Sequence, residues 1–70
     1  MINIEQLQAL GYKTKTKLLK GGFDLNHSKK SYLVSLSSDG DVTIIYPTNS
    51  KKSSVQFNDF DAFQKFHNEN

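Results

Sequence analysis

The chain has 70 residues and contains no cysteine, so it forms at most one domain, and neither disulfides nor a thiolate metal site can stabilise its small core. Its formal net charge is only +2, and no segment approaches the roughly 18 apolar residues of a membrane span. The N-terminal residues also lack the basic start and apolar run of a secretory signal. We therefore expect a single cytoplasmic domain over residues 1–70, with no metal, cofactor or membrane partner.

The first predicted element is a short helix over residues 4–10. Asn3 and Gln6 have the spacing of a capping box, in which each side chain bonds to the backbone N–H of the other residue. Gly11 follows at the C′ position, where many helices end in a left-handed residue. The apolar side chains of this helix share one face, which predicts packing against a larger element: Ile4, Leu7 and Leu10.

After this helix the pattern changes to strict alternation over residues 12–18, which is typical of a strand. One predicted face carries Lys13, Lys15 and Lys17, and the other carries Tyr12, Thr14, Thr16 and Leu18. Gly21 and Gly22 then interrupt or bulge the strand, and Phe23 begins a second apolar alternation. The pattern leaves open whether residues 20–30 continue this strand or form a loop.

The clearest pattern is an antiparallel hairpin over residues 31–47. A two-residue turn at Asp39 and Gly40 would mix apolar and polar side chains on both faces. A three-residue loop that ends at Gly40, with this glycine in the left-handed position, produces one wholly apolar face. This register pairs Tyr32 with Tyr46, Val34 with Ile44, Leu36 with Val42, Ser35 with Thr43 and Leu33 with Ile45. The apolar pattern therefore predicts the three-residue loop.

The residues beyond the hairpin predict a loop, a short strand and a helix. Pro47 ends the preceding strand because it has no N–H to donate, and Val55 and Phe57 alternate as in one further short strand. In the final segment Asn58 is the predicted N-cap, with Asp61 at the third helical position. The side chains expected on the core-facing side of this helix are Phe60, Phe63, Phe66 and His67.

Together these elements predict an α+β domain. We expect an antiparallel sheet of three to four strands, with the short N-terminal helix and the C-terminal helix packed on one of its faces. The opposite face of the sheet would then meet solvent or a partner.

Few residues of the chain are suited to catalysis. The only histidines are His27, expected to be exposed in a loop, and His67, expected at the edge of the core or as a cap near a helix C-terminus. Asp39 and Asp41 flank a turn, but the later ligands of a calcium loop are missing. We therefore expect that the protein is not an enzyme.

The strongest candidate for a binding site is the basic segment of the chain. Residues 11–30 hold six lysines and one acid, Asp24. On a regular strand, alternate lysines would stand about 6.6–6.8 Å apart in a row, close to the spacing of successive phosphates in an extended nucleic acid. The candidate binding residues are Lys13, Lys15, Lys17, Lys20, Phe23, Lys29 and Lys30. These lysines either protect an open sheet edge from unwanted pairing, bind a protein with an acidic surface, or bind nucleic acid.

The leading hypothesis from the sequence is a small non-catalytic binding module that occupies a protein surface, as an adaptor or inhibitor does. Its size would suit an accessory protein of a phage or other mobile element, such as an inhibitor of host defence, by analogy alone. The alternative is a weak, sequence-nonspecific nucleic-acid binder that uses the lysine-rich strand. The mild charge and the absence of arginine, the usual residue for bidentate phosphate and guanine recognition, disfavour this alternative.

Overall fold

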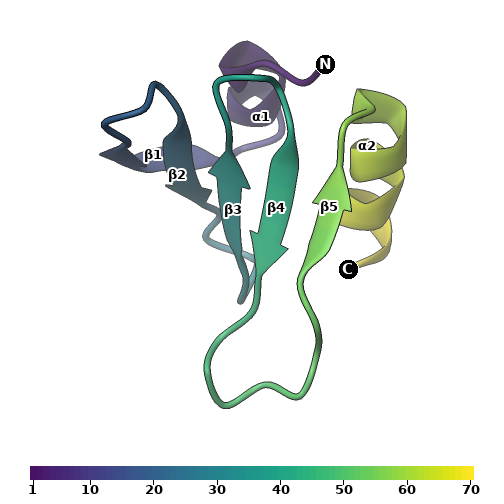
Figure 1. The fold of residues 1–70 in the computed structure, drawn as a ribbon. Coiled ribbons are helices and arrows are strands. Elements are labelled where there is room, and N and C mark those ends of the chain that lie inside the picture. The colour runs from purple at the N-terminus through teal and green to yellow at the C-terminus, as the bar shows by residue number, and fades with distance from the viewer.

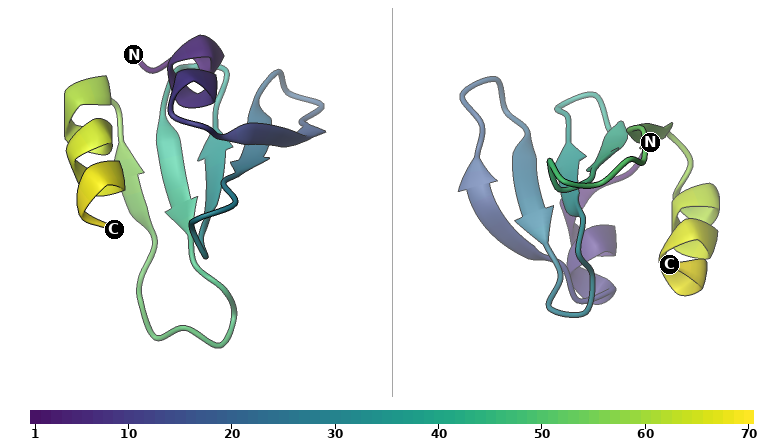
Figure 2. Two further views of the ribbon diagram at one scale, coloured as in Figure 1. Left: turned by 180° about the vertical axis from the view of Figure 1, so that it is seen from behind. Right: turned by 90° about the horizontal axis from the view of Figure 1, so that it is seen from below.

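The computed structural model describes residues 1–70, which form one helix, five strands and a second helix in chain order (Figure 1). The elements are α1 (Ile4–Ala9), β1 (Lys13–Lys17), β2 (Phe23–Asn26), β3 (Leu33–Leu36), β4 (Val42–Ile45), β5 (Val55–Phe57) and α2 (Phe60–Glu69). The strands form one antiparallel sheet in the order β1-β2-β3-β4-β5, and both helices lie on the same side of it (Figure 2). The predicted α+β class is therefore confirmed, with five strands in place of three to four.

The additional strand is β2, which follows a tight turn at the end of β1. The Leu18 N–H donates to the Gly22 carbonyl at 2.8 Å, and the Gly21 N–H donates to the Leu18 carbonyl at 3.0 Å. Gly21 has a φ of +95°. This is a three-residue hairpin loop with a left-handed glycine in its last position. Residues 20–30 therefore form the end of a turn, a strand and the start of a connection.

The β3–β4 hairpin has the predicted register and the same type of loop. Its pairs are Leu33 with Ile45, Val34 with Ile44, Ser35 with Thr43 and Leu36 with Val42. The Ser37 N–H donates to the Asp41 carbonyl at 2.8 Å, the Gly40 N–H donates to the Ser37 carbonyl at 3.1 Å, and the φ of Gly40 is +87°. The prediction of a three-residue loop is confirmed.

Local bonds fix both ends of α1 as its sequence predicts. Asn3 Oδ1 accepts from the Gln6 N–H, and Gln6 Oε1 accepts from the Asn3 N–H, each at 2.9 Å. At the C-terminal end, the Gly11 N–H donates to the Gln8 carbonyl at 3.0 Å and the Tyr12 N–H donates to the Leu7 carbonyl at 3.1 Å. This bonding pattern is a Schellman motif, which satisfies the last carbonyls of the helix.

The start of α2 differs from the prediction by one residue. The N-cap is Asp59, whose carboxylate accepts from the Ala62 N–H at 3.1 Å, and Asn58 lies outside the helix. A carboxylate at the cap also interacts favourably with the positive end of the helix dipole, which an amide does more weakly. The predicted core-facing side is correct, because Phe63 is buried and its neighbours on that face are half-buried.

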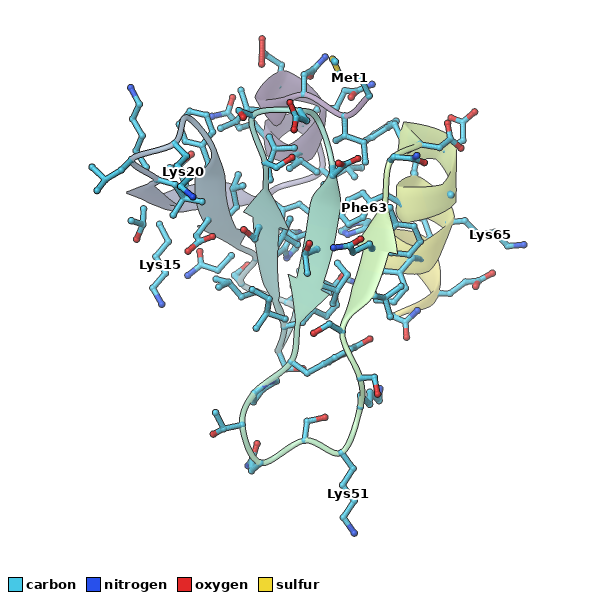
Figure 3. The ribbon with its side chains drawn as sticks, viewed as in Figure 1. Met1, Lys15, Lys20, Lys51, Phe63 and Lys65 are labelled. Atoms are coloured by element: carbon cyan, nitrogen blue, oxygen red, sulfur yellow. The ribbon has the colours of Figure 1, made fainter.

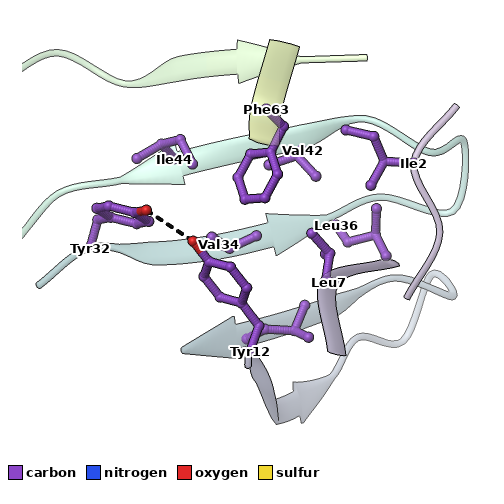
Figure 4. Close-up of a cluster of buried hydrophobic side chains, with 10 residues drawn as sticks. Ile2, Leu7, Tyr12, Tyr32, Val34, Leu36, Val42, Ile44 and Phe63 are labelled. Carbon is purple, nitrogen blue, oxygen red and sulfur yellow. Dashed lines mark hydrogen bonds between the residues drawn. The ribbon is translucent and has the colours of Figure 1, made fainter. Parts of the chain in front are cut away.

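The core lies between the helix-covered face of the sheet and the two helices (Figure 4). Phe63 from α2 and Leu7 from α1 point into the same cluster and are fully buried. The buried residues are Ile2, Leu7, Tyr12, Leu25, Tyr32, Val34, Leu36, Val42, Ile44 and Phe63. Tyr12 therefore belongs to the core, although the next five residues, β1, are all exposed.

Candidate functional site

Most of the candidate lysines lie on the β1–β2 hairpin, which forms one edge of the sheet. Strand β1 pairs only with β2, and all five of its residues are exposed. Lys20 lies exposed in the turn of this hairpin. Figure 3 shows Lys15 projecting away from the body of the protein. We use the term "basic hairpin" below for residues 13–26.

A β-bulge in β1 divides the predicted row of lysines. Thr14 pairs with Leu25 and Thr16 pairs with Asp24, so the intervening Lys15 is an extra residue in β1. Lys13 therefore lies opposite Asn26, and Lys17 lies opposite Phe23. Positions 23 and 26 of a strand lie on opposite faces of a sheet. Lys13 is thus on the outer face and Lys17 on the helix-covered face, and the expectation of one continuous row is wrong.

The bulge has a clear physical cause in the burial of Tyr12. The bond from the Leu18 N–H to the Gly22 carbonyl sets the register of β1 against β2. Without a bulge, this register would place Thr14 on the outer face with Asn26, and Tyr12 would point into water. With the bulge, Thr14 shares the helix-covered face with Leu25, and Tyr12 lies on that face as well. The extra residue therefore allows the turn to keep its register while Tyr12 remains buried.

The tip of the basic hairpin carries an apolar side chain that the sequence analysis did not single out. Leu19 is fully exposed in the turn, next to Lys20 and two residues after Lys17. The sequence did contain a signal for an exposed turn here. Residues 19–21, like the β3–β4 loop, are three residues of which the third is glycine. The tip therefore combines one unburied leucine with two flanking ammonium groups.

The other candidate residues do not join this tip. Phe23 is half-buried and packs against the core cluster, so it is not the exposed anchor that its sequence neighbours suggested. Lys29 is exposed in the β2–β3 connection. Lys30 is half-buried, and its Nζ donates to the His67 carbonyl at 2.7 Å, which ties this connection to α2. The structure therefore brings together Lys13, Lys15, Lys17 and Lys20 on the basic hairpin.

A second cluster, at the edge of the core, joins two tyrosines and two histidines. The Tyr12 hydroxyl lies 2.9 Å from the Tyr32 hydroxyl and 2.8 Å from His67 Nδ1. The His27 and His67 rings are 5.4 Å apart between centroids. We call these four side chains the Tyr–His cluster. It links the α1–β1 connection, the β2–β3 connection and α2.

His27 holds the C-terminal end of α1, which contradicts the expectation of an exposed loop histidine. Its ring is half-buried against Tyr12, with centroids 4.9 Å apart. His27 Nδ1 accepts from the Lys29 N–H at 3.0 Å, so the ring proton in this arrangement is on Nε2, which donates to the Leu10 carbonyl at 3.0 Å. A Cβ at Gly11 would lie 2.8 Å from that nitrogen, so the glycine makes room for the ring.

The protonation of the Tyr–His cluster suits a structural role. Burial raises the pKa of Tyr12, and this phenol keeps its proton. Burial also lowers the pKa of His67 below its ordinary value of 6.5, and electrostatic repulsion from Lys30, and from His27 when that ring is protonated, lowers it further. Because Tyr12 is almost completely buried, its hydroxyl is out of reach of a substrate. The cluster therefore joins separate elements of the fold.

We predict that the protein loses stability as the pH falls below about 6.5. The folded state resists protonation of His67, so the unfolded chain binds more protons in this range, and the free energy of unfolding decreases through it. Urea titrations at about pH 7.5 and pH 5.0 would measure the loss. The variant His67→Asn keeps an acceptor near the Tyr12 hydroxyl but does not titrate. An equal loss in this variant would contradict the assignment to His67.

Comparison with known proteins assigns no family to the chain. No protein-family model, curated protein or solved structure matches it. The histidines and acids do not gather in any group of three or more that could hold a metal ion. A surface hollow lined by Asp41, Gln56, Phe57 and Asn58 contains a single titratable side chain. Neither helix combines the length and the apolar composition needed to cross a bilayer.

Proposed function

We propose that the protein is a small non-catalytic module that binds an acidic surface of another protein through its basic hairpin. By occupying that surface, it would act as an adaptor or an inhibitor. The observation that carries this proposal is the fully exposed Leu19 at the tip, flanked by Lys17 and Lys20. Protein interfaces commonly place an apolar anchor within a polar rim, and burial of the anchor supplies much of the affinity.

The alternative of nucleic-acid binding has less support. Its motivation was an even row of lysines, and the bulge at Lys15 separates Lys13 and Lys17 onto opposite faces. Single-strand binders also stack bases on exposed aromatic rings. The nearest ring to the lysines along the hairpin, Phe23, packs against the core instead. An acidic protein surface requires neither feature, so we favour it.

The test is reversal of three charges on β1, with Lys13, Lys15 and Lys17 replaced by glutamate. All three are exposed, and exposed substitutions usually change stability by less than about 0.5 kcal/mol each. Once the partner has been isolated by affinity capture, we expect the association rate to fall by about tenfold or more. Stopped-flow or surface-based kinetics would measure it.

The matched control replaces three other exposed lysines, Lys51, Lys52 and Lys65, by glutamate, which changes the net charge equally. Lys51 and Lys65 lie away from the hairpin (Figure 3), and Lys52 follows Lys51 in the same loop. This control should bind almost normally. The proposal fails if both triple variants bind alike. It also fails if the wild type binds DNA with a slope of log K against log salt near about −2.7, the value for three duplex phosphates, and the β1 reversal removes that slope.

A further inference from the structure

We propose that the partner contributes an extended acidic segment, which pairs with the open edge of β1 as a sixth strand of the sheet. This inference rests on the proposed function and specifies how the basic hairpin engages its partner. Strand addition is a common mode of peptide recognition, in which backbone hydrogen bonds supply affinity and side chains supply selectivity.

The first observation is that the outer edge of β1 is free. The only strand beside it is β2, and all five residues of β1 are exposed. Figure 2 shows β1 as the outermost element on its side of the sheet. The other edge of the sheet is less suitable, because β5 (Val55–Phe57) has only three residues and leads directly into α2.

The second observation concerns the backbone groups that face this edge. Leu18 occupies a position bonded to β2, because its N–H donates to the Gly22 carbonyl. Bonded and non-bonded positions alternate along an antiparallel pair. The N–H and C=O of the preceding residue, Lys17, therefore point away from β2 toward the open edge. An added strand would find a donor and an acceptor at this residue.

The third observation is the distribution of charge produced by the bulge. Lys13 lies on the outer face and Lys17 on the helix-covered face. A strand added to β1 presents its own side chains alternately on both faces, so acids on either face would meet a lysine. A partner lying flat on one face would meet only part of this charge. The same bulge that breaks the row therefore fits an acidic strand at the edge.

The charge also excludes a second copy of this chain as the occupant. Two β1 strands side by side would bring lysines with no intervening acid into cross-strand contact, which is destabilising. Lysines on an edge strand are a known protection against such pairing. An acidic segment would instead be attracted by these lysines. The edge therefore disfavours pairing with another basic strand and favours pairing with an acidic one.

The experiment uses a blocked synthetic heptapeptide, Thr-Glu-Glu-Thr-Glu-Glu-Thr, which carries acids on both faces when extended. Two further peptides carry N-methyl groups, one on the even amides only and the other on every amide. Alternate amides of a strand point toward opposite edges, so the first peptide keeps one unmethylated edge for β1 and the second has none. We expect binding at low salt, about tenfold slower amide exchange at Lys17, and a loss of about tenfold in affinity for the fully methylated peptide only.

The outcomes separate this inference from the proposed function. If the acidic peptide does not bind, or binds without slowing exchange at Lys17, strand addition is wrong. Equal binding of both methylated peptides would also overturn it, while loss of native partner binding in the β1 charge reversal would still support the proposed function. If the peptide binds the β1 reversal and the wild type alike, both ideas fail. The control variant at Lys51, Lys52 and Lys65 should bind the peptide as the wild type does.

Discussion

Replacing Phe63 by alanine is expected to lower the free energy of unfolding by about 3–5 kcal/mol. The side chain is fully buried, and its ring lies 5.7 Å from that of Tyr12 and 5.9 Å from that of Phe57 between centroids. It is the one fully buried residue of α2, so its removal leaves a cavity between this helix and the sheet (Figure 4). The loss is a large fraction of the stability of so small a domain.

Urea titration followed by circular dichroism would measure this loss. Phe60→Ala is the matched control, because it removes the same side chain from the same helix at a half-buried position. We expect a clearly smaller effect there, since part of that ring is already in water. Equal losses for the two variants would mean that α2 does not depend on the packing of Phe63 described above.

The second large effect is expected for Gly40→Val, which should lower the free energy of unfolding by about 3 kcal/mol. This loss combines backbone strain at a positive φ with partial exposure of the Ile2 side chain. A Cβ at Gly40 would overlap Met1 Cγ and lie 3.1 Å from the Ile2 nitrogen. The Ile2 N–H donates to the Gly40 carbonyl at 2.9 Å, and the Ile2 side chain is buried. The substitution would therefore strain the turn and also displace the N-terminal segment from the core.

Gly21→Val separates these two causes. Gly21 has the same place in the same type of loop and a φ of +95°, but a Cβ there would meet only Ser38, at an ordinary 3.5 Å. Gly21→Val should lower the free energy of unfolding through backbone strain alone, by about 1–2 kcal/mol. Thermal or urea unfolding would give both values. If Gly40→Val costs no more than Gly21→Val, the docking of Ile2 on the hairpin contributes little.

The features that the sequence determined by itself depend on interactions between residues close in the chain. The capping box of Asn3 and Gln6 spans one helical turn, and the loop that ends at Gly40 was identified because only one register kept the apolar side chains of the hairpin together. The aromatic face of α2 likewise follows from helical periodicity. Such signals are complete within a few residues, so no knowledge of the rest of the fold is required.

The placement of the candidate site residues depended on contacts between distant parts of the chain. His27 was expected in water, but Gly11, sixteen positions earlier, leaves room for its ring against Tyr12. Phe23 was considered as an exposed anchor, but the core packs against it, whereas Leu19 at the turn has nothing to cover it. Local patterns identify which residues are apolar or basic. They do not show which of them another element covers.

The row of lysines shows most clearly which features depend on the local sequence and which depend on the tertiary structure. The alternation of residues 13–17 is perfect in the sequence and predicts one face for every lysine, yet the structure places Lys13 and Lys17 on opposite faces. The turn at Leu18–Gly22 sets the register at one end of β1, and burial of Tyr12 requires the opposite phase at the other end. Only one extra residue, Lys15, satisfies both. The local sequence therefore determined that this segment is a basic strand. The distribution of its lysines over both faces of the sheet was decided by the free energy of burying Tyr12 in the tertiary core.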